Sequence, residues 1–188
     1  MIYITRHGES EYNLVDRIGG DSNLSKNGHI YSKKLEEYIK NNKNMPKKCI
    51  TSTKKRTIQT AEYLKNHMIE IEHLQCLDEI NAGIAENITY NEFKNMYPDE
   101  YDSRKKNKLT YKYPNNGESY IDLILRTKQF CDKIIENKEN VLIICHQAIA
   151  RALLYHFTKC DILQIPDLQI PLHKILCIND EKYEIITP

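Results

Sequence analysis

The sequence predicts an α/β fold in which helices cover both faces of a mainly parallel sheet. Short apolar, β-branched runs alternate with amphipathic segments from the N-terminus almost to the end of the chain, which is the pattern of parallel sheets. One run, Val141–Cys145, is apolar throughout, as strands buried on both faces are. Ligands of open α/β sheets bind beyond the carboxyl ends of the strands, so chemistry is expected there.

The other elements follow from the spacing of their apolar residues. We expect further strands over Ile2–Thr5, Lys48–Thr51 and Ile69–Ile71, and a closing hairpin of Leu172–Ile178 and Tyr183–Ile186 that brings one antiparallel strand into the sheet. Helices are expected over residues 29–39 with Ser25 as N-cap, and over Thr53–Leu64, Thr89–Met96, Ser119–Ile135 and Ala148–Phe157. Pro98 is expected to end the helix that starts at Thr89.

Length and composition indicate one globular domain over residues 1–188, with 40% hydrophobic and 28% charged residues. The balance of 27 Lys and Arg against 26 Asp and Glu gives no reason to expect nucleic acid or a membrane as a partner. No apolar run nears the roughly 20 residues of a membrane span, and no signal peptide is visible. Six cysteines stand singly without a CxxC pair, which indicates free thiols and a cytoplasmic location.

Two histidines and two arginines follow three of the expected strands. Arg6 and His7 come after the first strand, Arg56 shortly after the second, and His146 directly after Val141–Cys145. A single histidine at a strand end is more often structural, so the convergence of all four carries the prediction. Arginine is also scarce here, with 6 of the 27 cations, and its planar fork suits phosphate oxygens.

This set of side chains suits a phosphate dianion better than a metal. Zinc fits poorly, because the arginines repel the cation and no third ligand stands at helical spacing. One imidazole can attack phosphorus while the other donates a hydrogen bond to the transition state. A carboxylic acid must then protonate the leaving alkoxide, and Glu79 is the candidate, with Glu9 and Asp78 as competitors. No ATP-binding glycine loop is present.

Three motifs resemble those of the histidine phosphatase (phosphoglycerate mutase-like) superfamily. They are Arg6-His7-Gly8-Glu9-Ser10-Glu11-x-Asn13, Ser52-x-x-x-Arg56-Thr57-x-Gln59-Thr60-Ala61, and His146 after an apolar strand. The resemblance implies a phosphoglycerate mutase-like, three-layer αβα sandwich and catalysis through phosphohistidine, without cofactor or metal. Within this family His7 is the nucleophile, Arg6, Arg56 and His146 hold the transferring phosphoryl group, and Glu79 is the proton donor.

Further stretches are similar to the fructose-2,6-bisphosphatase domain of the bifunctional 6-phosphofructo-2-kinase/fructose-2,6-bisphosphatase family. They are Arg17–Ser25, Asp78–Gly83, Thr89–Pro98, Tyr113–Tyr120, Asn140–Ala148 and Pro171–His173. This similarity implies a phosphorylated sugar as substrate, hydrolysis of its 2-phosphate, and a role in glycolysis regulation. The alternatives are a histidine phosphatase of broader specificity and a non-catalytic phosphate-binding protein.

The same similarity implies the substrate-binding residues. Asn13 and Gln147 add hydrogen bonds to the 2-phosphate, and the backbone at Gly20 closes the pocket. The 6-phosphate contacts match Tyr90, Arg104, Lys108, Tyr120 and Arg151. Arg104 and Lys108 can share a helical face if that segment is helical, whereas the other interpretation is a solvated basic loop. The turn at Asn115-Asn116 is one residue longer than the family's, so the placement of Tyr120 tests the resemblance.

Overall fold

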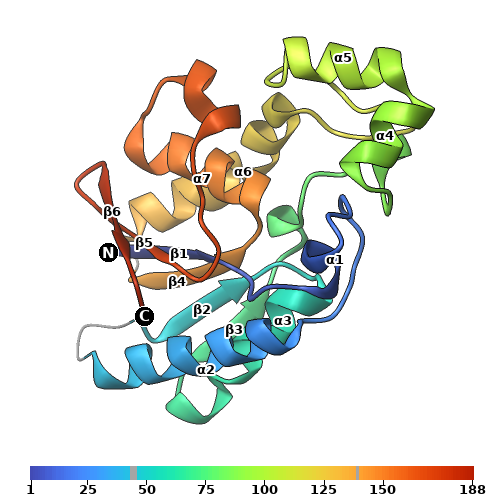
Figure 1. Ribbon diagram of the computed structural model, residues 1–188. Coiled ribbons are helices and arrows are strands. Elements are labelled where there is room, and N and C mark those ends of the chain that lie inside the picture. Colours follow the sequence, from blue (N-terminus) through green and yellow to red (C-terminus); the bar gives the residue numbers. More distant parts are fainter. Residues whose placement is uncertain (43–45, 139) are drawn as a thin grey trace.

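A six-stranded sheet forms the centre of the computed structural model, which describes residues 1–42, 46–138 and 140–188 (Figure 1). The strand order is β3-β2-β4-β1-β5-β6. The strands are β1 (Ile2–Arg6), β2 (Lys48–Thr51), β3 (Glu70–His73), β4 (Val141–Cys145), β5 (Ile175–Asn179) and β6 (Lys182–Ile186). Each expected strand is therefore present, with β3 shifted by one to two residues from the predicted range.

The sheet is mainly parallel, and one strand runs against the others. β4 pairs in parallel with both β1 and β2, and β2 pairs in parallel with β3. β5 is antiparallel to both of its neighbours, β1 and β6, as the closing hairpin predicts. Thr5 and Thr51 both stand level with Ile144, so the carboxyl ends of β1, β2 and β4 meet at one edge.

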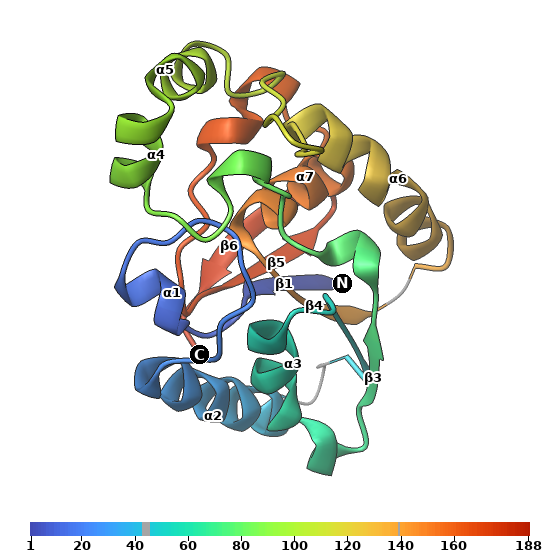
Figure 2. The same ribbon diagram turned by 90° about the vertical axis from the view of Figure 1, so that its right-hand side faces the viewer.

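Helices cover both faces of the sheet, which gives three layers (Figure 2). On one face, α2 (Lys26–Asn41) and α3 (Lys55–Glu62) pack against alternate strand residues such as Tyr3, Cys49 and Leu142. On the other, α6 (Tyr120–Glu136) and α7 (Gln147–Thr158) bury the opposite set, which includes Ile4, Ile50 and Ile143. Strand side chains alternate between the two faces, so one sheet supplies both cores. The three-layer prediction is confirmed.

A small helical cap stands beyond the carboxyl edge of the sheet. It contains α4 (Tyr90–Met96) and α5 (Pro98–Lys106), near the short α1 (Glu11–Leu14), and has its own core with Phe93 at its centre (Figure 1). Pro98 was expected only to end a helix, and this is wrong in part: α4 ends at Met96, and Pro98 starts α5. Proline suits the first turn because its missing N–H has no helical partner there.

Short single turns complete the chain. They are 3-10 helices at Lys65–His67, Gln75–Leu77, Gly83–Ala85 and Ile162–Asp167. The strand expected from Leu172 begins only at Ile175, because His173 has a left-handed backbone (φ 60°) and stacks on Tyr31. All six cysteines are free, as their spacing predicts. Within the described ranges no helix is long and apolar enough to cross a membrane.

Candidate active site

The three motifs meet at the carboxyl edge of the sheet. His7 follows β1, Arg56 lies in the first turn of α3 after β2, and His146 follows β4 as the N-cap residue of α7. The centroids of the two imidazole rings are 5.1 Å apart. Arg56 Nε lies between them, 3.1 Å from His7 Nε2 and 3.2 Å from His146 Nδ1. The convergence predicted from strand ends is confirmed.

His7 presents an unprotonated Nε2. Its Nδ1 lies 2.7 Å from the carbonyl oxygen of Gly8, which can only accept, so Nδ1 carries the proton. Nε2 then accepts from Arg56. Burial, and next the charges of Arg56 and Arg6, lower the pKa of His7 well below its usual value. The imidazole is therefore neutral, with its Nε2 lone pair on the reactive side.

Close packing fixes the backbone beside His7. A Cβ on Gly8 would lie 2.5 Å from the carbonyl oxygen of Gly28 in α2, so only glycine allows this approach. The Gly8 N–H donates to Thr60 Oγ1 at 2.9 Å. The segment that carries His7 is therefore held by contacts with α2 and α3.

His146 is fully buried, and a hydroxyl chain holds its far side. Its Nδ1 accepts from Arg56, so Nε2 carries the proton and donates to Ser52 Oγ at 2.8 Å. The Ser52 hydroxyl in turn contacts Thr57 Oγ1 at 2.7 Å. Burial, and then the charge of Arg56, lower the pKa of His146 well below its usual value. Both imidazoles are neutral beside two guanidinium groups.

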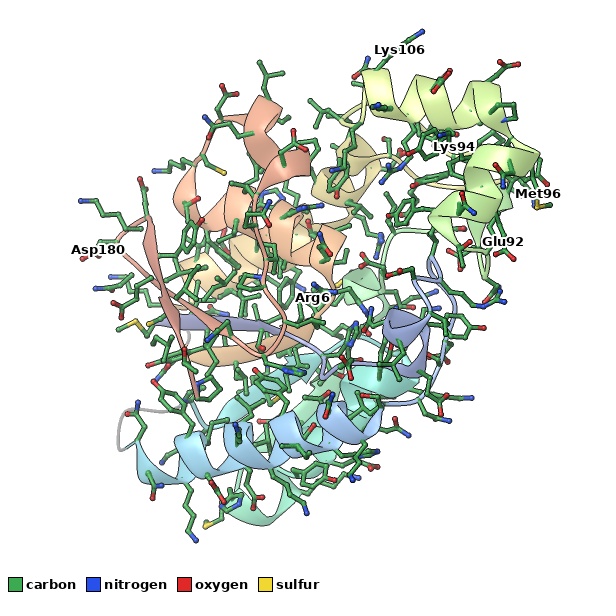
Figure 3. All side chains as sticks on the ribbon, in the orientation of Figure 1. Arg6, Glu92, Lys94, Met96, Lys106 and Asp180 are labelled. Carbon is green, nitrogen blue, oxygen red and sulfur yellow. The ribbon has the colours of Figure 1, made fainter. Side chains whose placement is uncertain are left out.

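The two arginines leave donor capacity for an anion. Arg56 Nη1 donates to the carbonyl of Gly20 at 2.8 Å, and Arg6 Nη1 to that of Ile170 at 3.1 Å. Arg6 Nε is buried and has no partner, which is a costly state for an N–H group. Arg6 points inward at the end of β1, near the centre of the molecule (Figure 3). An unsatisfied donor beside two guanidinium charges fits a phosphate oxygen.

Of the three candidate carboxylates, Glu79 lines the site. Its Oε1 accepts from the N–H of Ala148, in the first turn of α7, at 3.2 Å. Glu9 instead accepts from Ser25 Oγ, and Asp78 from the N–H and hydroxyl of Thr53. Glu9 and Asp78 therefore hold loops together, and Glu79 is the one of the three that lines the cavity.

One cavity of about 410 Å³ is lined by residues of both predicted sets, whereas His146 is fully buried and does not line it. Its walls include Arg6, His7, Asn13, Arg56, Glu79 and Gln147 at one end, with Tyr90, Arg104, Lys108, Tyr120 and Arg151 at the other. Gly20 does not line it: its carbonyl accepts from Arg56 and its N–H donates to Glu86, so it positions the guanidinium. Within the described residues no group of three His, Cys, Asp or Glu side chains is placed to hold a metal.

The family model of the histidine phosphatase superfamily (branch 1) matches residues 2–185 of this sequence. The chain belongs to the histidine phosphatase superfamily. It is also 43% identical over 182 residues to the 6-phosphofructo-2-kinase/fructose-2,6-bisphosphatase of Aquarana catesbeiana, covering 97% of this chain and 38% of that protein. The 6-phosphofructo-2-kinase/fructose-2,6-bisphosphatase 4 of Rattus norvegicus is 44% identical over 182 residues, covering 97% of this chain and 38% of that protein. The chain thus spans well under half of the curated relatives it matches.

Solved structures share the fold of this histidine phosphatase. The alpha-ribazole phosphatase of Shigella flexneri superposes with a TM-score of 0.83 at 17% identity, covering 99% of this chain and 94% of that one. Mycobacterial glucosyl-3-phosphoglycerate phosphatase with VO3 superposes with a TM-score of 0.81 at 20% identity, covering 98% of this chain and 96% of that one. At such identities the likeness concerns the fold alone.

The far end of the histidine phosphatase cavity is a cation cluster lined by tyrosines. Arg104 Nε donates to Tyr113 Oη, and its guanidinium carbon lies 5.2 Å from the ring centroid of Tyr90. Arg151 Nη1 donates to Tyr120 Oη at 2.7 Å. Tyr120 lines the cavity, and it follows a turn in which Asn115 and Asn116 both have left-handed backbones (φ 63° and 60°).

Lys108 lines the cavity, but not as part of the helix that carries Arg104. α5 ends at Lys106, so Arg104 and Lys108 do not share a helical face. The following turn brings Lys108 to the cavity, where Nζ contacts the carbonyl of Pro166 and lies 3.3 Å from Asp167 Oδ1. Lys106, by contrast, points into solvent at the outer end of α5 (Figure 3). Burial, and then Arg151, lower the pKa of Lys108.

Several residues of the cavity wall had no role in the sequence analysis. Tyr12, Arg17, Ile18, Tyr111 and Tyr113 also line it. Tyr113 begins a stretch noted only for its resemblance, Tyr111 stands two positions before it, and their ring centroids are 5.1 Å apart. A Tyr-x-Tyr pair after the basic segment is the one sequence signal that could have pointed to them.

Proposed function

We propose that this chain is a phosphatase domain over residues 1–188 that hydrolyses the 2-phosphate of fructose 2,6-bisphosphate, giving fructose 6-phosphate and phosphate. One observation carries the proposal: a single cavity is lined by Arg6, His7 and Arg56 at one end and by Arg104, Lys108 and Arg151 at the other. A small molecule with two phosphates satisfies both cation clusters at once. The named activity of the curated relatives, over the matching 97% of this chain, supports the same substrate.

The geometry supports a two-step mechanism. His7 Nε2 attacks phosphorus, the bond from phosphorus to the fructose 2-oxygen breaks, and Glu79 gives that oxygen its proton. Water then loses a proton to Glu79 and attacks the phosphohistidine, the P–N bond breaks, and phosphate leaves. Arg6, Arg56 and His146 stabilise the charge on the phosphoryl oxygens in both steps. Asn13 and Gln147 complete the contacts to this group.

A second candidate is a histidine phosphatase of broader specificity. The observation that favours it is the state of the distal cluster, where Lys108 already contacts Asp167 and Arg104 already donates to Tyr113. A second phosphate must compete with these partners, which weakens selection for a bisphosphate. A purely phosphate-binding role fits less well, because His7, Glu79, Arg6 and Arg56 line one cavity and His146 accepts a hydrogen bond from Arg56.

The proposal also places the chain in the cytoplasm and, through its substrate, in the regulation of glycolysis. Six free cysteines support a reducing compartment. Neither nucleic acid nor a membrane belongs to the proposed partners, because the net charge is only +1.

A phosphate-release assay tests the function. Fructose 2,6-bisphosphate is compared with fructose 1,6-bisphosphate, 3-phosphoglycerate and p-nitrophenyl phosphate, with His7→Ala beside the wild type. Preference for the 2,6-isomer that the variant lacks would support the proposal. Equal rates on all substrates, absent in the variant, would favour the broader phosphatase. No hydrolysis of any substrate would contradict both candidates.

A further inference from the structure

One arginine lies outside the phosphate cavity and uses all its donors on the protein. Arg126, in α6, contacts three carbonyl oxygens of the segment 75–78: those of Cys76 at 3.0 Å, Asp78 at 3.1 Å from both Nη1 and Nη2, and Gln75 at 3.3 Å. Its Nε and Nη2 also donate to the two carboxylate oxygens of Glu118, at 2.9 and 3.0 Å. The guanidinium therefore ties α6 to the segment that leads directly into Glu79.

Glu118 holds the other side of Glu79. Its Oε2 accepts from the N–H of Asn81 at 2.9 Å, and its own N–H donates to the carbonyl of Asn81 at 2.8 Å. The residue before Glu79 and the residue two positions after it are thus both fixed by the Arg126–Glu118 pair. Both side chains are about one quarter exposed or less, at 24% and 22%, so solvent weakens the pair only in part.

The carboxylate of Glu79 depends on this backbone. It accepts from two backbone N–H groups, that of Ile80 at 3.0 Å and that of Ala148 at 3.2 Å. The direction of the carboxylate toward the cavity therefore follows the backbone path through residues 78–81. A displacement of a catalytic group by about 1 Å can cost about 100-fold in rate.

We propose that Arg126 and Glu118 form a positioning pair that aims Glu79 at the leaving oxygen, an inference that rests on the acid role in the proposed function. Arginine is required because one rigid fork serves the Glu118 carboxylate and three carbonyls at once. Lysine has a single nitrogen with three donors and no fixed plane, so it cannot reproduce this set of contacts. The pair touches neither phosphate cluster, so it acts through Glu79.

The test uses the leaving group to separate aiming from general damage. An alkoxide must be protonated as it leaves, whereas p-nitrophenolate leaves readily without an acid. Rapid-quench and stopped-flow measurements on full-length protein give the rate of phosphohistidine formation from each substrate. The alkyl substrate is the sugar phosphate that the wild type hydrolyses fastest. The variants are Arg126→Lys, Arg126→Ala and Glu118→Gln, with Glu79→Gln as the reference for loss of the acid.

We expect phosphohistidine formation from the alkyl phosphate to slow about 10- to 100-fold in Arg126→Ala, and less in Arg126→Lys and Glu118→Gln. The burst of p-nitrophenolate should stay within about threefold of the wild type, because that step needs no acid. Lys128→Ala is the matched control: it removes another cation of α6 and its ion pair with Asp132, and should change neither rate. Glu118→Gln retains the size of the side chain, so it serves if Arg126→Ala does not fold.

Two results would overturn the inference. Equal slowing of both substrates in folded variants would show a general structural role, and wild-type rates on both would show that the pair is dispensable. Failure of the proposed function is a separate result, because it shows in the wild-type protein as the absence of preference for the 2,6-isomer. If Glu79→Gln itself slows both substrates equally, the acid role falls, and the positioning role falls with it.

Discussion

Arg56 Nε donates a hydrogen bond to His7 Nε2 across 3.1 Å, so a cation faces the nitrogen that attacks phosphorus in the proposed mechanism. A guanidinium cannot accept a proton, so this contact is incompatible with a protonated Nε2. Burial acts in the same direction by disfavouring the imidazolium. In the free protein His7 Nε2 is therefore unprotonated. In the proposed mechanism, a phosphate that binds between His7 and Arg56 accepts the hydrogen bond of Arg56 in place of Nε2.

The first prediction concerns the titration of His7. Because the pKa of His7 is well below its usual value of about 6.5, we expect the His7 ring to stay neutral from pH 8 down to pH 5.5. NMR of the imidazole carbon-bound protons measures this, and a His7→Gln spectrum assigns the signal. A titration midpoint near 6.5 for the His7 signal would contradict the neutral nucleophile.

The second prediction is a loss of stability in acid. The unfolded chain takes up protons on both histidines as the pH falls through about 6.5, whereas buried His7 and His146 do not. The free energy of unfolding should therefore be unaffected by these groups above that pH and fall below it, by up to about 1.4 kcal/mol per pH unit for each histidine. Urea unfolding between pH 7.5 and 5 should show a flatter dependence for His146→Asn. Parallel curves for the two proteins would contradict this account.

The third prediction separates the two ends of the cavity. Arg104→Ala removes a charged donor from the distal cluster, so KM for fructose 2,6-bisphosphate should rise by about 10- to 100-fold. This range corresponds to the loss of one hydrogen bond to a charged group, which contributes about 1.5–3 kcal/mol. KM for p-nitrophenyl phosphate should not change. Lys105→Ala, which removes the neighbouring exposed cation of α5, is the control. Equal effects on both substrates would exclude a second phosphate site at Arg104.

The periodicity of apolar residues was enough to predict the layers and α4 of the cap, but not α5. Helices α2, α6 and α7 each bury an apolar stripe, and such stripes are visible in a sequence. α5 buries none of its residues, so no period reveals it, and Pro98 then suggests an end where the structure has a start. His173 likewise delays the start of the expected strand through a ring contact with Tyr31, which is distant in sequence.

The candidate site also has a part that residue order predicts and a part that it does not. Arg6, His7 and His146 could be placed from residue order alone, because the carboxyl ends of parallel strands meet at one edge. The distal cluster required the family resemblance, since Arg104 and Arg151 come from a cap helix and from α7. The hydrogen bonds of Tyr113 and Arg126 are invisible in the sequence, because a turn brings Tyr113 back to Arg104 of α5 and Arg126 of α6 contacts a segment 50 positions away.

The fourth prediction concerns metals. Two guanidinium groups, those of Arg6 and Arg56, line the cavity and repel a divalent cation, and the proposed mechanism assigns charge stabilisation to them. We therefore expect phosphatase activity to be unchanged after dialysis against EDTA and after addition of Mg²⁺. Loss of activity on chelation, restored by a metal, would contradict the histidine and arginine mechanism.

The last prediction concerns Ser52, which controls the tautomer of His146. In the free site Nδ1 accepts from Arg56 and Nε2 donates to Ser52 Oγ. To donate to a phosphoryl oxygen, Nδ1 must carry the proton, and Nε2 must then accept. A hydroxyl can do both, because it rotates between accepting and donating.

Ser52→Ala removes the hydroxyl that can both donate and accept, and it leaves the buried Nε2 of His146 without this hydrogen-bond partner. We expect unfolding to become about 1–3 kcal/mol easier, with kcat for p-nitrophenyl phosphate falling about 10-fold while KM changes little. Thr57→Val is the matched control, because it removes the next hydroxyl of the chain and leaves the contact of Ser52 with His146 intact. Urea unfolding and steady-state kinetics measure both effects. A Ser52→Ala protein with wild-type kcat would show that His146 works in one tautomer throughout, and Arg6 and Arg56 would then donate to the phosphoryl oxygens without it.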